Sequence, residues 1–151
     1  MRHLRNMSKL GRNCGHRKAL LVNLACSLIE HGQIKTTINR AKEARKMVDA
    51  LITYAKEGSE HSRRLAARKL KINTPVEKLQ GKKLVLEKLF SQLGPAYANR
   101  PGGYTRIIHL GHRVGDGAVS VMIQLVDVAE PAKKEEQPAS EATVEAKAEA
   151  K

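Results

Sequence analysis

Side chains that could carry out catalysis are few and poorly placed in this sequence. Acid–base catalysis needs a carboxylate or a histidine held beside a nucleophile. The nine acidic residues before position 129 are instead scattered among lysines and arginines. Asp49, for example, follows Arg45 by four residues and Lys46 by three, which is the spacing of ordinary ion pairs on a helix. We therefore expect no catalytic site and no enzyme activity.

Motifs for metals and for bound phosphates are also missing. Cys14 and His16, together with His3, could be imagined as metal ligands, but no second pair stands at the spacing of a structural zinc site. The glycine-rich stretch GHRVGDG lacks the Lys-Ser/Thr ending of a phosphate-binding loop and does not match a dinucleotide fingerprint. It is better explained as a hairpin turn, flanked by His109 and His112 at the surface. The sequence therefore predicts neither a metal nor a cofactor.

The cysteines and the apolar runs indicate the cellular compartment in which the protein works. Eleven residues separate Cys14 from Cys26, which fits neither a disulfide framework nor a paired metal-ligand motif and favours a reducing interior. No apolar run approaches the roughly 20 residues of a membrane span. The N-terminus has positive charge but lacks the apolar stretch of a signal peptide. These features predict a cytoplasmic protein.

Positive charge is the strongest signal in the sequence. The chain has 28 lysines and arginines against 15 aspartates and glutamates, which gives a net charge of +13 and a pI near 10.0. Without residues 129–151 the balance is 24 against 9, so the rest of the chain is more basic than the whole. Each cation that neutralises a phosphate releases a counterion, so such a body can bind a nucleic-acid backbone without reading bases.

Aromatic residues distinguish between kinds of nucleic-acid binding. Only four are present, Tyr54, Phe90, Tyr97 and Tyr104, which is too few for the stacking platforms of single-strand binders. Recognition of the backbone and shape of folded RNA therefore fits better than recognition of splayed bases.

The N-terminal segment is the first place where this charge gathers. Residues 1–18 contain several basic and polar side chains, and no acidic residue occurs before Glu30. Because such a segment repels itself and has little to bury, we predict an extended arm over residues 1–16 that orders against an anionic partner. The alternative is a frayed, solvated terminus.

Three later segments also present positive charge. A helix that begins at Asn39 and is ended by Gly58 has Lys42, Arg45, Lys46 and Lys56 on the flank opposite its apolar side. Residues 59–71 form a shorter, strongly charged helix, and a charge run of this kind is more often a solvated face than a binding surface. The small residues of the loop from 100 to 103 allow close approach of a backbone, with the Tyr104 and Arg106 side chains placed to wedge against a sugar or base. The alternative for this loop is a plain β-turn.

Hydrophobic periodicity predicts the elements that carry these residues. We expect a buried helix over residues 17–31 with Gly32 at its C-terminus, a strand over 33–38, and the helix over 39–55 with Asn39 as its N-cap. The charged helix over 59–71 follows. A T-P-x-E capping box at residues 74–77 begins an interrupted segment, and a clear helix over 83–93 stops at Gly94-Pro95. Strands over 104–110 and 118–128 then form an antiparallel hairpin, with Val119, Val121, Ile123 and Leu125 facing inward.

These elements make an α+β chain with one folded domain. We predict a small mixed sheet packed on helices over residues 17–128, preceded by the basic arm and followed by a disordered tail over residues 129–151, which is rich in Ala, Glu and Lys.

Several short motifs, taken in order, resemble a known family. They are R-H at residues 2–3, G-H-R-K-A at 15–19, I-K-T-T at 34–37, A-K-E at 41–43, L-I-T at 51–53, R-R-L-A at 63–66, R-P-G-G-Y-T-R-I at 100–107 and L-V-D at 125–127. Their order and gaps are similar to those of bacterial large-subunit ribosomal protein seventeen, from Met1 to about Asp127. The stretch around residues 71–83 looks longer than the family's connection, and the tail extends beyond its usual end.

The resemblance implies a two-layer α/β domain in the order helix, strand, three helices, two strands. It implies one copy per ribosome, bound to large-subunit ribosomal RNA near the nascent-chain exit side and beside large-subunit protein thirty-two, with no catalysis and no cofactor. Together with the charge pattern it predicts RNA contacts along the arm, the first strand, the cationic helices and the loop before the hairpin. The predicted RNA-binding residues are Arg2, His3, Arg5, Lys9, Arg12, Asn13, His16, Arg17, Lys18, Lys35, Thr36, Thr37, Arg40, Lys42, Arg45, Lys46, Arg63, Arg64, Arg100, Gly102, Gly103, Tyr104 and Arg106.

Two other classes of function are kept as alternatives. A nucleoid-type DNA-binding architectural protein would share the positive charge, but it should show dimer features and minor-groove wedges, of which the sequence gives no sign. An RNA-processing enzyme would need an acid–base or metal cluster, which the sequence does not offer.

Overall fold

The computed structural model describes residues 8–72 and 80–126. The helices and strands follow one another as α1 (Cys14–His31), β1 (Gln33–Thr37), α2 (Ile38–Glu57), α3 (Glu60–Lys69), α4 (Gln80–Lys88), the π-helical turn η2 (Leu89–Leu93), α5 (Gly94–Ala96), β2 (Thr105–His112) and β3 (Val119–Leu125). Since α4, η2 and α5 run on as one helical rod, this is the predicted order of a helix, a strand, three helices and two strands. The first seven residues of the predicted arm, the T-P-x-E capping box and the predicted tail lie outside the described residues.

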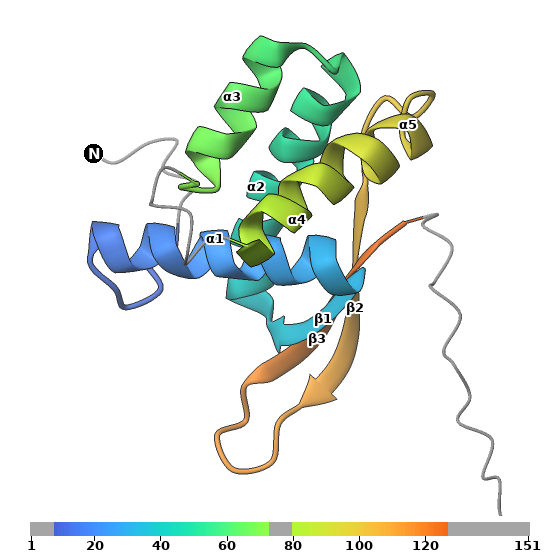
Figure 1. The fold of residues 1–151 in the computed structure, drawn as a ribbon. Coiled ribbons are helices and arrows are strands. Elements are labelled where there is room, and N and C mark those ends of the chain that lie inside the picture. The colour runs from blue at the N-terminus through green and yellow to red at the C-terminus, as the bar shows by residue number, and fades with distance from the viewer. Residues whose placement is uncertain (1–7, 73–79, 127–151) are drawn as a thin grey trace, which may run out of the picture.

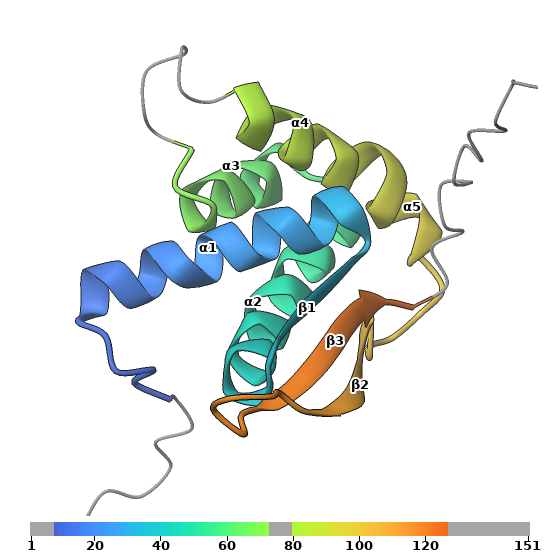
Figure 2. The same ribbon diagram turned by 90° about the horizontal axis from the view of Figure 1, so that it is seen from below.

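Helix α2 is the element on which the others pack. Its predicted apolar side is confirmed, because Ala41, Ala44, Val48, Leu51 and Ile52 are all fully buried. The helix contacts α1, α3, η2, α5 and all three strands. Figures 1 and 2 show α3 and the α4–α5 rod on one side of α1 and α2, and the sheet on the other.

The sheet has the strand order β1-β3-β2, and both pairings are antiparallel. The prediction of a mixed sheet was therefore wrong. Strands β1 and β2 run in the same direction, but β3 lies between them, so no parallel pair forms. The predicted alternation of β3 is confirmed, because Val121 and Ile123 are fully buried and Leu125 is nearly so.

Two helices begin earlier in the chain than the sequence predicted. The side chain of Asn13 accepts a hydrogen bond from the backbone N–H of His16, so α1 begins at Cys14 rather than at Arg17. Residues 14–16, predicted to belong to the arm, form the first turn of this helix. Helix α2 follows β1 directly, with Thr37 in the N-cap position, so the assignment of Asn39 as N-cap was wrong.

The predicted stop at Gly94-Pro95 was also wrong, because the helical rod continues to Ala96. A proline inside an α-helix has no N–H to donate and clashes with the carbonyl four residues earlier. Here the backbone N–H of Gly94 donates to the carbonyl of Leu89, five residues back, so the widened turn η2 ends with one residue, Gly94, between it and Pro95. Gly94 itself is buried, and a Cβ at this position would lie 2.8 Å from the carbonyl oxygen of Ala55 in α2.

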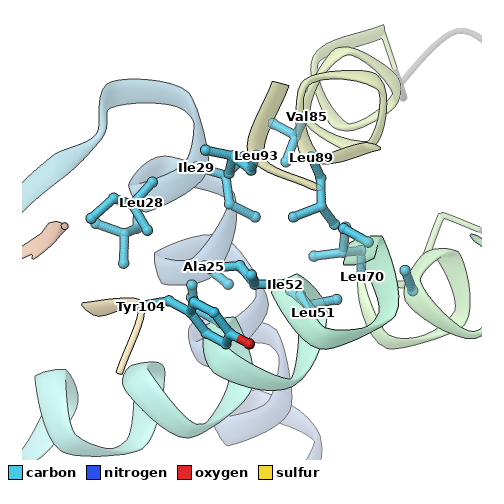
Figure 3. Packing of buried hydrophobic residues seen from close by; sticks show 14 of the residues in the cluster. Ala25, Leu28, Ile29, Leu51, Ile52, Leu70, Val85, Leu89, Leu93 and Tyr104 are labelled. Atoms are coloured by element: carbon cyan, nitrogen blue, oxygen red, sulfur yellow. The ribbon is translucent and has the colours of Figure 1, made fainter. Parts of the chain in front are cut away.

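The core lies where α1, α2 and the rod meet. Figure 3 shows Leu28 and Ile29 of α1, Leu51 and Ile52 of α2 and Leu89 of the rod, which all belong to one buried cluster. Burying each such side chain stabilises the fold by about 1.5–3 kcal/mol. Only one stripe of α1 is fully buried, and the leucines at positions 20, 21 and 24 stay partly exposed, so this helix is less enclosed than its sequence predicted.

Candidate nucleic-acid interface

The structure places most of the predicted RNA-binding residues at the surface. Arg2, His3 and Arg5 lie outside the described residues. The exposed residues are Lys9, Asn13, His16, Lys18, Lys35, Lys42, Arg45, Lys46, Arg63, Arg64, Gly102, Gly103 and Arg106. The half-buried residues are Arg12, Arg17, Thr36, Thr37, Arg40 and Arg100, and Tyr104 is buried.

A first cationic region surrounds the start of α1. The first turn of this helix contains no acidic residue, and the positive end of the helix dipole adds to the charge of Arg17 and Lys18. Arg12 is held in place, because its Nη1 donates to the carbonyl of Leu10 at 3.0 Å and its Nε to Nε2 of His16 at 3.4 Å. This region can attract a phosphate without any rearrangement of the helix.

Glu43 ties this region to α2. The residue is 8% exposed, and its carboxylate accepts a hydrogen bond from the backbone N–H of Ser8 at 3.1 Å and forms an ion pair with Nζ of Lys46 at 3.0 Å. Sequence reasoning missed this role. The signal was present, because no other acidic residue stands between Glu30 and Asp49.

The cationic flank of α2 is partly neutralised within the helix. Arg45 forms an ion pair with Asp49 at 3.6 Å, as the four-residue spacing predicted, and Lys46 pairs with Glu43. Burial raises the pKa of Asp49, while hydrogen bonding from Thr105 and the nearby Arg45 guanidinium oppose the rise. Lys42 is exposed on the same helix.

The first strand divides the predicted K-T-T group between two faces of the sheet. Thr36 pairs with Val121 and so shares the face that is buried against the helices, whereas Lys35 pairs with Met122 on the opposite, open face. Arg106 of β2 pairs with Gln124 and lies on that open face too. The Cα atoms of Lys35 and Arg106 are roughly 12 Å apart, from two strand spacings and a two-residue offset. Two cations therefore stand on either side of β3.

The loop between the helical rod and β2 is built around Tyr104. This ring is 4% exposed and packs against Tyr97, with ring centroids 5.2 Å apart. The carbonyl of Arg100 accepts hydrogen bonds from Nζ of Lys56 at 2.6 Å and from the Tyr104 hydroxyl at 3.3 Å. Lys56 therefore fixes this loop, although the sequence placed it on the cationic face.

The Tyr104 ring is buried, so it cannot wedge against a sugar or a base as predicted. The aromatic side chain belongs to the core, whereas Gly102 and Gly103 of the loop are exposed, the latter with a φ of 67°. Glycines in such a loop allow a phosphate backbone to come close to the peptide.

On α3 the two predicted arginines are exposed. The guanidinium of Arg63 lies 5.8 Å from the centroid of the Phe90 ring, which holds this side chain against the rod. Arg64 follows it on the same helix.

These cations do not converge on one spot. Glu43 and Lys56 anchor regions at opposite ends of α2, about 20 Å apart at the rise of an α-helix. The sheet face and α3 add further separate regions, on opposite sides of α2 (Figure 2). A molecule that presents cations on several sides can hold several segments of one large polyanion together.

Other chemistries find no support within residues 8–72 and 80–126. No group of three or more His, Cys, Asp or Glu side chains there could hold a metal ion. Cys14 and Cys26 are free thiols, and burial raises the pKa of the latter. None of the helices in this part of the chain is long and apolar enough to cross a membrane.

Comparison with known proteins identifies a family over most of the chain. The family model described as ribosomal protein L17 matches residues 20–126. The chain belongs to the ribosomal protein L17 family. Members of this family are structural proteins rather than enzymes.

Named relatives cover nearly the whole chain. The large ribosomal subunit protein bL17 of Akkermansia muciniphila is 48% identical over 141 residues, which cover 93% of this chain and 96% of that protein. The protein of the same name from Syntrophotalea carbinolica is 48% identical over 84% of this chain and 76% of its own length. That from Dinoroseobacter shibae is 50% identical over 84% of this chain and 85% of its own length.

Proposed function

We propose that this chain is a structural constituent of the large ribosomal subunit in the bacterial cytoplasm, and that it stabilises large-subunit ribosomal RNA through contacts to phosphates. The proposal rests above all on the match to relatives named as large-subunit proteins along 93% of the chain. The distribution of exposed cations on the folded body supports the mode of binding.

The open face of the sheet is the best-defined of the proposed RNA contacts. Lys35 and Arg106 are exposed on one rigid surface on either side of Met122 and Gln124. Cations on strands are held more firmly than cations on a frayed terminus, so less conformational entropy is lost when they bind. The start of α1 and the exposed Gly102 and Gly103 are further proposed contacts.

The neighbours of the chain are the finer part of this proposal. We infer that one copy lies near the nascent-chain exit side of the large subunit, beside large-subunit protein thirty-two. The family resemblance supports this placement.

Salt extraction of purified ribosomes tests the proposed place in the large subunit. Attachment through phosphate contacts weakens steeply with ionic strength. The full-length chain should sediment with large subunits at moderate salt and leave them only at high salt. Sedimentation with small subunits alone would refute the proposal, and equal affinity for duplex DNA and ribosomal RNA would favour a DNA-binding architectural protein instead.

Point variants test the phosphate contacts one at a time. Lys35→Ala and Arg106→Ala should each lower the slope of log affinity against log salt for ribosomal RNA by about one. Arg113→Ala is the matched control, because that guanidinium already forms an ion pair with Asp116. A variant at Lys35 or Arg106 with an unchanged slope would show that its cation contacts no phosphate.

A further inference from the structure

The chain makes a tight turn immediately before α1. Leu10 and Gly11 both have positive φ values, 53° and 61°, and the backbone N–H of Arg12 donates to the carbonyl of Lys9 at 3.1 Å. These are the features of a reverse turn with two left-handed central residues. A leucine in this conformation costs free energy, so other contacts must hold it there. We call residues 9–12 the N-terminal turn.

Glu43 of α2 holds one end of the N-terminal turn. Its Oε1 accepts a hydrogen bond from the backbone N–H of Ser8 at 3.1 Å, and the same oxygen accepts one from Nζ of Lys46 at 3.0 Å. Because Glu43 is 8% exposed, these bonds are partly shielded from water and are stronger than at an open surface. At the other end of the turn, the Asn13 side chain caps α1. The turn is therefore tied to two helices.

The N-terminal turn brings two cations together. Lys9 and Arg12 occupy its first and last positions, whose Cα atoms lie within about 7 Å of each other in a β-turn. Lys9 is exposed. The Arg12 guanidinium donates to the carbonyl of Leu10 and to Nε2 of His16. These bonds occupy two of its five N–H donors, so the others can still reach a phosphate.

The charge of Glu43 is unfavourable for a surface that binds RNA. A carboxylate weakens the attraction of a polyanion, and its ion pair with Lys46 also neutralises a nearby cation. Glu43 differs from a cation in one useful respect, because a carboxylate can accept the backbone N–H of Ser8. Any favourable contribution of Glu43 to RNA binding must therefore come from the conformation that it holds.

We propose that Glu43 is a positioning residue for RNA binding. By holding Ser8 it fixes the N-terminal turn, which then presents Lys9 and Arg12 together to phosphates of one segment of large-subunit ribosomal RNA. Glu43 itself touches no phosphate. The inference rests on the proposed function and adds to it a residue of the wrong charge for direct contact. A turn that is fixed before binding loses less conformational entropy when the RNA binds.

Two substitutions of equal charge separate position from electrostatics. Glu43→Ala and Glu43→Gln remove the same negative charge, but only the glutamine side chain can still accept the Ser8 N–H. If charge alone mattered, both full-length variants would bind ribosomal RNA equally and more tightly than the unchanged chain. We expect Glu43→Ala to bind about fivefold more weakly than Glu43→Gln, because one hydrogen bond that fixes the turn is lost. Equal affinities would overturn the proposal.

Glu87 provides the matched control for this comparison. It is exposed on α4, so Glu87→Ala and Glu87→Gln should bind ribosomal RNA with equal affinity. A difference between them as large as that at Glu43 would overturn the proposal. If the unchanged chain does not bind ribosomal RNA at all, the proposed function fails instead.

Substitutions at Gly11 test the turn without any change of charge. A Cβ at this position would meet no atom within 4 Å, so only the backbone conformation opposes a side chain. Alanine disfavours a positive φ, whereas asparagine tolerates it. Gly11→Ala should therefore bind ribosomal RNA at least fivefold more weakly than the unchanged chain, and Gly11→Asn should bind nearly as well as that chain. Equal losses in both variants, or no loss in either, would contradict the proposal.

Amide hydrogen exchange of the free full-length chain tests the positioning itself, without RNA. The backbone N–H groups of Ser8 and Arg12 should be protected in the unchanged chain and in Glu43→Gln. In Glu43→Ala they should lose protection, while the amides in the middle of α2 keep theirs. Exchange of Ser8 at the rate of an unstructured peptide in the unchanged chain would overturn the proposal. Loss of protection throughout α2 in Glu43→Ala would overturn it too, because Glu43 would then support the fold rather than the turn.

Discussion

Replacing Gly94 by alanine should destabilise the protein, although alanine is the better helix former. The new Cβ would lie 2.8 Å from the carbonyl oxygen of Ala55 and 3.3 Å from its carbonyl carbon, whereas ordinary contacts begin at 3.4 Å. Because the opposing atoms belong to the backbone of α2, the rod and α2 must move apart. Such overpacking costs about 1–3 kcal/mol, against a gain of about 1 kcal/mol in helix propensity. We expect a net loss of up to about 2 kcal/mol.

Gly81→Ala on α4 is the matched control for this substitution. A Cβ at Gly81 would meet no atom within 4 Å, so the propensity gain stands alone and stability should rise by up to about 1 kcal/mol. Thermal unfolding followed by circular dichroism measures both variants. At about 4 °C per kcal/mol for a domain of this size, Gly94→Ala should melt as much as 8 °C lower and Gly81→Ala a few degrees higher. A Gly94→Ala variant as stable as the unchanged chain would refute the described packing of the rod on α2.

Three further predictions concern single side chains. Asp49→Asn should raise the melting temperature at pH 7, because burial disfavours the charged carboxylate. Since the folded pKa of Asp49 is raised, its contribution favours folding at low pH and is lost as pH rises through that pKa, so the advantage of the variant should shrink as pH falls toward 4. Tyr97→Phe should cost about 1–3 kcal/mol in urea unfolding, because it removes the hydroxyl that donates to the carbonyl of Val126 at 2.5 Å; an unchanged midpoint would contradict this bond. Arg17→Ala should lower the salt slope of RNA binding by about one if its guanidinium touches one phosphate, and an unchanged slope would remove it from the interface.

Much of the fold could be predicted because its signals are local and repeated. The three-and-four spacing of apolar residues in α2 and the alternation in β3 each specify a buried face over several turns or pairs. Gly32 and Gly58 end α1 and α2 with φ values of 77° and 66°, as a left-handed C-terminal residue requires.

The structural predictions failed where contacts between segments far apart in the sequence override a local sequence signal. Gly94-Pro95 reads as a stop by local rules, but the close approach of α2 and the widened turn η2 keep the rod helical. The Tyr104 ring lies in the core because Tyr97, at the end of the rod, packs against it. No pattern within either segment indicates that contact.

The candidate RNA-binding surface could likewise be predicted only in part. Exposure of the cations on α1, α2 and α3 follows from helical periodicity, and the separation of Thr36 from Lys35 follows from strand alternation. The partly buried hydrogen bonds between Glu43 and Ser8 and between Lys56 and Arg100 join residues 35 and 44 positions apart, so only the folded structure reveals them.

A density map of this chain's own large ribosomal subunit tests the central claim most directly. It should show the chain in the particle, with the start of α1 and the open sheet face that carries Lys35 and Arg106 against RNA phosphates. A map in which these surfaces face solvent, or in which the chain is missing from the subunit, would contradict the account.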